Sequence, residues 1–102
     1  MKTLFFETSL EGHRYEYLRN LYYACIEKEE QSFLFYIPED ERVKGWKHAE
    51  NMRVEYLSQQ QIDYATKGNL LLLSYRKAKI IKRLVEKYNV SHVFLIFFML
   101  YM

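Results

Sequence analysis

The residues best suited to chemistry lie in one short segment, Glu7-Thr8-Ser9-Leu10-Glu11-Gly12-His13-Arg14, which directly follows an apolar run. Gly12 permits a tight turn and lets a ligand approach the main chain with no Cβ between them. A helix that begins at His13 would offer its first N–H groups to a phosphate or a carboxylate. Side chains of the same segment would add hydrogen bonds and charge. We therefore predict that Ser9, Gly12, His13 and Arg14 bind a ligand.

A plainer interpretation of the same segment stays open. Gly12 would then only permit the turn, and the neighbouring side chains would only cap the helix. Glu7 and Glu11 would oppose an anion placed there. The dinucleotide motif G-x-G-x-x-G and the P-loop motif are both absent from the sequence.

The other chemistry-bearing residues suggest no catalytic group. A single cysteine, Cys25, excludes an internal disulfide and a multi-thiolate zinc site, and its place on an apolar stripe predicts a packed thiol. His13, His48 and His92 lack the spacing of metal ligands, so we expect no metal. An acidic cluster, Glu39, Asp40 and Glu41, follows the second apolar run. In some nucleotide-binding sheets an acidic group at this position holds a ribose hydroxyl, although a solvated loop is the commoner reason for such acids.

Length and composition limit the possible classes of protein. With 102 residues, half of them hydrophobic and 18% aromatic, residues 1–102 should form a single domain. A net charge of +2 predicts no dominant electrostatic field for nucleic acid or acidic lipid, and we expect no nucleic-acid partner. The apolar run over residues 93–102 is about half the roughly 20 residues that a membrane-spanning helix needs. No signal peptide is visible, and we expect a cytoplasmic protein without a transmembrane segment.

Apolar runs and helical periodicities alternate along the chain. The patterns predict strands at 3–8, 32–37, 53–57 and 92–101, and helices over 13–26, within 39–51, after Ser58 and over about 69–88. Because strands alternate with helices, we predict an α/β three-layer sandwich whose four-stranded parallel sheet has the order 3-2-1-4, half of a Rossmann-like domain. The apolar runs at 33–37 and 93–100 fit strands covered on both faces. In the last helix, one stripe is expected to face the core: Leu71, Tyr75, Ala78, Ile81, Val85 and Tyr88.

The segment Ser9-Leu10-Glu11-Gly12-His13-Arg14-Tyr15-Glu16-Tyr17-Leu18, after a Phe-rich strand, resembles the opening of glycosyltransferases with the GT-B architecture. Their first strand runs into a glycine-containing loop and a helix that begins G-H-x-x-x-x-L or similar. The resemblance implies an acceptor-side domain in which Gly12, with His13 beside it, reaches toward the phosphates of a sugar nucleotide. It implies a glycan or sugar-nucleotide ligand and no further cofactor. Because these residues lack the donor-binding domain, it also implies a fragment without activity of its own.

Two other functions compete with this one. The chain is alternatively a small nonenzymatic α/β module that binds a nucleotide or a protein partner through the first strand–helix loop. A flavodoxin-like enzyme is less favoured, because the loop lacks a run of glycines and hydroxyls. In either case the fourth strand should lie at a sheet edge as a long, uncharged apolar run, residues 94–100. Such an edge favours pairing with a second copy, so we expect a homo-oligomer, most simply a homodimer.

Overall fold

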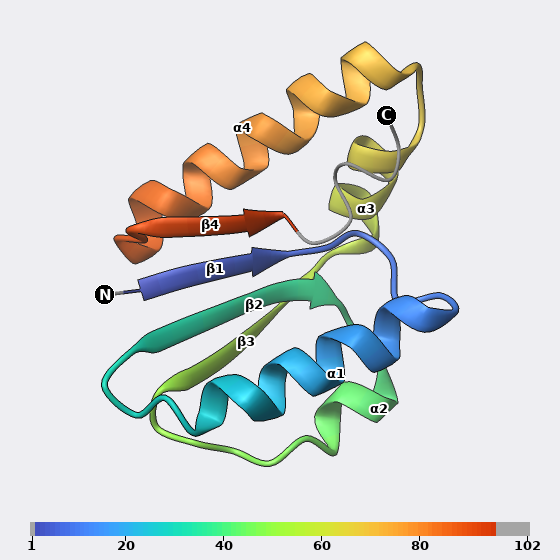
Figure 1. The fold of residues 1–102 in the computed structure, drawn as a ribbon. Helices are drawn as coiled ribbons and strands as arrows, with labels where there is room; N and C mark the ends of the chain where they lie inside the picture. Colours follow the sequence, from blue (N-terminus) through green and yellow to red (C-terminus); the bar gives the residue numbers. More distant parts are fainter. Residues whose placement is uncertain (1, 96–102) are drawn as a thin grey trace.

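The computed structural model describes residues 2–95, which form a sheet with helices packed on both of its faces (Figure 1). The elements are β1 (Lys2–Phe6), α1 (His13–Ile26), β2 (Ser32–Pro38), α2 (Glu41–Lys44), β3 (Met52–Leu57), α3 (Gln59–Thr66), α4 (Leu70–Tyr88) and β4 (His92–Leu95).

All four strands are parallel, and their order is β3-β2-β1-β4. β1 pairs with β2 from Lys2↔Ser32 to Phe6↔Tyr36, and with β4 from Thr3↔His92 to Phe6↔Leu95. The fold class and strand order predicted from the sequence are therefore confirmed. In this order β1 and β2 are central, and their carboxyl ends lie at the same edge of the sheet.

Two separate hydrophobic clusters make the three layers. Side chains alternate along β1 and β2, so that Phe5 and Phe35 face α1 and α2, while Leu4 and Leu34 face α3 and α4. On the first face Phe35 is fully buried, with the Tyr22 ring edge-on at 5.4 Å between centroids. The central strands are covered on both faces, as the unbroken apolar run of β2 predicts.

Local signals in the sequence explain where the helices begin and end. Ser58 and Gln61 form a reciprocal capping box at the start of α3. Gly68, at φ 137°, separates α3 from α4, and Asn69 caps α4 by accepting the N–H of Leu72. These devices explain why a helix begins directly after Ser58 and why a second one begins after Asn69, close to the starts predicted from the sequence.

Three predicted elements differ from the structure in extent. The strand predicted over residues 3–8 is Lys2–Phe6, so Glu7 and Thr8 belong to the loop that follows it. Helical structure within residues 39–51 is confined to Glu41–Lys44, because Gly45 ends it and the following chain is irregular. Of the predicted fourth strand, residues 92–95 are described and do pair with β1, whereas 96–101 lie outside the described residues.

Two predictions about side-chain faces need correction. On α4 the predicted residues Leu71, Tyr75 and Ala78 are exposed, and the buried positions are Ile80 and Leu84. Ile81 and Tyr88 of the predicted stripe do pack against the core, so the prediction fails for the first half of the helix and holds in part for the second. The helix is apolar over a wider arc than the sheet can cover. On β4, which lies at a sheet edge as predicted, Val93 and Phe94 are 39% and 46% exposed, so its faces are not fully covered at these two positions. The rest of the run predicted to be covered on both faces, residues 96–100, lies outside the described residues.

Candidate functional site

The candidate site lies where the chain leaves β1 at the carboxyl edge of the sheet. Glu7 and Thr8 are buried, and Leu10 inserts into the hydrophobic cluster under α1. The loop is thus anchored by one apolar side chain before it turns into α1 at Gly12. In parallel α/β sheets this edge is where ligands bind.

Glu7 organises the first half of the loop. Its Oε1 accepts the backbone N–H groups of Thr8 at 2.8 Å and of Ser9 at 3.2 Å, and Nη1 of Arg14 lies 3.9 Å away. Burial raises the pKa of the Glu7 carboxyl above its usual value, although these hydrogen bonds and the charge of Arg14 act in the opposite direction. Two N–H groups of the loop therefore already have an acceptor within the protein. From the sequence, Glu7 is expected to oppose an anion and to lie within a strand over 3–8; the structure ends that strand at Phe6 and puts the Glu7 carboxyl in the loop.

Gly12 has a backbone conformation, φ 61° and ψ −136°, that side-chain-bearing residues rarely adopt. A Cβ at this position would meet nothing within 4 Å, so glycine is required by the turn and not by packing. Gly12 is also the N-cap residue of α1, and no side chain caps this helix. The start of α1 thus keeps backbone N–H groups without a side-chain acceptor, as the ligand-binding prediction needs.

A hollow of about 380 Å³ opens beside this loop. One wall is the loop itself, from Thr8 to Gly12, and the opposite wall comes from the end of β2 and the start of α2. The full lining is Thr8, Ser9, Leu10, Glu11, Gly12, Pro38, Asp40, Arg42 and Ile62. The sheet therefore brings together two segments that the sequence analysis singled out separately, the Gly12 loop and the acidic turn at Asp40.

Asp40 and Arg42 form an ion pair on the far wall of the hollow. Asp40 caps α2 by accepting the backbone N–H of Arg42 at 2.8 Å, and its carboxylate also accepts Nε and Nη2 of Arg42 at 3.0 and 2.9 Å. These bonds hold the pKa of Asp40 below its usual range. The Arg42 guanidinium stacks 3.9 Å from the centre of the Tyr15 ring, which places a cation against the first turn of α1.

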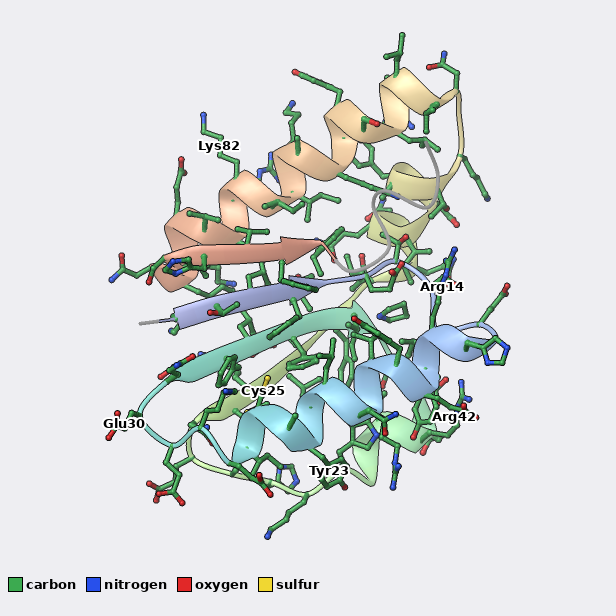
Figure 2. All side chains as sticks on the ribbon, viewed as in Figure 1. Arg14, Tyr23, Cys25, Glu30, Arg42 and Lys82 are labelled. Carbon is green, nitrogen blue, oxygen red and sulfur yellow. The ribbon has the colours of Figure 1, made fainter. Side chains whose placement is uncertain are left out.

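The four predicted binding residues divide into two groups. Ser9 and Gly12 line the hollow, and the Ser9 hydroxyl already accepts the N–H of Glu11 at 3.2 Å. His13 is exposed at the start of α1, while Arg14 extends toward Glu7. Figure 2 shows Arg14 and Arg42 on either side of the start of α1. Arg42 is the cation of the hollow that sequence reasoning missed, because its contact with Tyr15 joins residues far apart in the chain.

The remaining candidates have structural roles. Cys25 is buried in the cluster under α1, and burial raises the pKa of its thiol, which fits the predicted packed thiol. Tyr15 and Trp46 pack together, with the indole N–H donating to the Tyr15 hydroxyl at 3.1 Å. His48 and His92 are both exposed. Over residues 2–95, no group of His, Cys, Asp and Glu side chains could hold a metal ion.

Searches against protein-family models, curated proteins and solved structures find no match to this chain. Among the helices of residues 2–95, none has the length and apolar character needed to span a bilayer. The fold and the geometry of the site therefore carry the functional argument.

Proposed function

We propose that the chain is the acceptor-side part of a glycosyltransferase of GT-B architecture, and that its Gly12 loop faces the phosphates of a sugar nucleotide. The observation that carries this proposal is the hollow at the carboxyl edge of the sheet, shared by the β1–α1 loop and the start of α2. The uncapped start of α1 favours an anion there, whereas the Arg42 guanidinium is already paired with Asp40 and adds no net positive charge to the hollow. The resemblance over Ser9–Leu18 supplies the family; the parallel fold alone is shared by many nucleotide-binding proteins.

In this proposal each loop residue has a distinct role. The main chain at Gly12 and His13 approaches the phosphates, and the Ser9 hydroxyl donates to an oxygen. Arg14 and the buried Glu7 hold the loop in shape from beneath. We propose ligand binding without turnover for these 102 residues by themselves, because they contain no donor-binding domain.

One observation favours a second candidate, a nonenzymatic module that binds a nucleotide. Asp40 lies in the same hollow as Gly12, at the end of the second strand. This is the position from which an acidic side chain holds the ribose in dinucleotide-binding sheets. The DNA sequence downstream of codon 102 discriminates the two: an in-frame continuation into a second Rossmann-like domain favours the glycosyltransferase, and a stop followed by an unrelated gene favours the module.

Two further features belong to the same proposal. The β4 edge, where Val93 and Phe94 are partly exposed, pairs with a second copy to form a homo-oligomer. The protein is located in the cytoplasm.

Amide chemical shifts during a nucleotide titration test the function. UDP- and GDP-sugars are added to the ¹⁵N-labelled chain, and the Gly12, His13 and Arg14 amides are expected to shift with saturation at millimolar ligand. The Gly12→Ala variant should lose the response, and Gly45→Ala, at a glycine with an ordinary negative φ of −85°, should keep it. Absence of any shift in the loop at millimolar nucleotide would leave the segment as a connection only.

A further inference from the structure

The tip formed by α3 and the start of α4 is unusually apolar for an exposed surface. Leu70, Leu71 and Leu72 are 51%, 85% and 38% exposed, and Tyr75, one turn further on, is 61% exposed. The tip is held in place by Arg76, whose Nη1 donates to the backbone oxygens of Tyr64 and Lys67 at 3.1 Å each. These four side chains, Leu70, Leu71, Leu72 and Tyr75, are called the leucine tip below.

The rest of α4 is strongly basic. The helix contains six cations and a single acid, Glu86, and therefore carries a charge of +5. Because the whole chain carries +2, the other residues together carry −3. The six cations are Arg76, Lys77, Lys79, Lys82, Arg83 and Lys87. The positive charge of the protein is thus concentrated on one helix, directly behind an exposed apolar end.

The cations stand at a defined distance from the leucine tip. At a rise of 1.5 Å per residue, Lys79 lies about 12 Å along the helix from Leu71, and Arg83 about 18 Å. Lys79 and Arg83 also line a hollow of about 380 Å³ between α3 and α4, with Gln60, Gln61, Tyr64 and Ile80. No carboxylate is among these lining residues. Figure 2 shows Lys82 projecting into solvent from the outer side of the same helix.

We propose that the leucine tip and the cations of α4 dock the protein onto an anionic lipid surface. The tip enters the boundary between headgroups and acyl chains, where interfacial helices bury their apolar side chains by about 5–10 Å. Lys79 then lies nearest the lipid phosphates, Lys82 and Arg83 lie further out along the helix within about one Debye length of them, and the hollow between α3 and α4 receives one headgroup. The inference is independent of the proposed nucleotide site, which lies at the β1–α1 loop.

Charge and size argue against the other occupants of this surface. A second copy docked by the same face would bring two helices of +5 together, which is unfavourable. Four side chains are also far fewer than the roughly 20–30 residues that each partner contributes to a stable protein interface. An anionic lipid surface satisfies both the charge and the small apolar area.

Vesicle binding with charge-matched variants tests the proposal. The 102-residue chain is mixed with phosphatidylcholine vesicles containing 30% phosphatidylglycerol, and the bound fraction is measured by sedimentation. Lys79→Glu with Lys82→Glu should lower the partition coefficient at least about 25-fold, because each juxtamembrane cation contributes about fivefold. The control pair Lys28→Glu with Lys47→Glu changes the net charge equally from exposed positions outside α4, and it should retain most of the binding.

The apolar contribution is tested separately with Leu71→Ser. Leu71 is so exposed that the variant should fold normally, while its partition coefficient falls about tenfold or more. Unchanged binding by Leu71→Ser, or an equal loss in both charge-reversed pairs, would overturn the proposal. It would also be overturned if Leu71→Ser converted a dimer to a monomer in sedimentation velocity, because the tip would then be a self-association surface. Amide shifts at Gly12 with nucleotide are not expected to respond to any of these changes.

Discussion

Replacement of Gly12 by alanine tests the backbone geometry on which the candidate site depends. The residue lies at φ 61° and ψ −136°, a region that side-chain-bearing residues adopt at a cost of about 1–3 kcal/mol. No atom lies within 4 Å of the new Cβ, so the variant adds no clash. Alanine also lowers the conformational entropy of the unfolded chain, and this raises the free energy of unfolding by about 0.4–1 kcal/mol. The expected net loss is therefore about 1–2 kcal/mol.

Gly45→Ala is the matched control for this measurement. Gly45 lies at φ −85° and ψ −2°, where alanine is unstrained, and its new Cβ would lie 3.6 Å from the Arg42 carbonyl oxygen, an ordinary contact. The control should be neutral or stabilised by up to about 1 kcal/mol. Urea unfolding followed by circular dichroism should therefore separate the two variants by about 1–3 kcal/mol. In thermal unfolding Gly12→Ala should melt below the unmodified chain by about 4–8 °C for each kcal/mol of stability lost.

The result that refutes the reasoning is a Gly12→Ala protein as stable as Gly45→Ala. The backbone at residue 12 would then have an ordinary negative φ, and α1 would not begin by the turn described here. If Gly12→Ala is destabilised as expected yet folded, its nucleotide titration becomes informative. Loss of the amide shift in that folded protein would indicate that a ligand approaches the main chain where the Cβ now stands.

Two further predictions concern single side chains. The pKa of Glu7 is higher in the folded protein than its ordinary value of 4.5, so the folded state binds this proton more tightly than the unfolded state. The contribution of Glu7 to the free energy of unfolding therefore falls as the pH rises from 4.5 through the folded pKa. The stability of the unmodified chain relative to Glu7→Gln should therefore decrease over that interval in urea unfolding at a series of pH values; a constant difference would contradict the raised pKa. Ser58→Ala removes the hydroxyl that accepts the Gln61 N–H at 3.1 Å, whereas the Gln61 side chain keeps the bond that it accepts from the backbone N–H of residue 58. We expect a loss of about 1 kcal/mol in thermal or urea unfolding, and a loss below 0.3 kcal/mol would show that the capping box is not formed.

The sheet and its strand order could be predicted from the sequence because the patterns that indicate strands and helices are local. Each strand is a short apolar run, and each crossover contains a helical periodicity, so the parallel arrangement follows from alternation alone. The start of α3 could also be predicted from the sequence, because the two residues that cap it, Ser58 and Gln61, are close in sequence. In the candidate site, the same locality identified Gly12 and Ser9.

The contacts that complete the site could not be predicted from local sequence patterns. The Arg42 guanidinium lines the hollow and stacks on Tyr15, which lies 27 positions earlier in the chain. No periodic pattern in the sequence predicts a contact between residues so far apart. The bonds that Glu7 accepts from Thr8 and Ser9 are local, but the burial of its carboxyl is a result of tertiary packing that the sequence pattern does not show. Sequence reasoning therefore found the segments of the site and missed which charges are paired within it.

The error on α4 and the proposed membrane surface have one physical cause. An amphipathic helix on a sheet needs an apolar arc only as wide as the face that the sheet covers. In α4 the second half meets this condition, with Ile80 and Leu84 buried, whereas the first turn is leucine at four successive positions, Leu70 to Leu73. Four consecutive leucines point in all directions around a helix, so the sheet cannot bury them all. Some of these leucines therefore stay exposed, next to the cations of the same helix. In our proposal the acyl region of an anionic membrane covers them, and the vesicle experiment measures that binding.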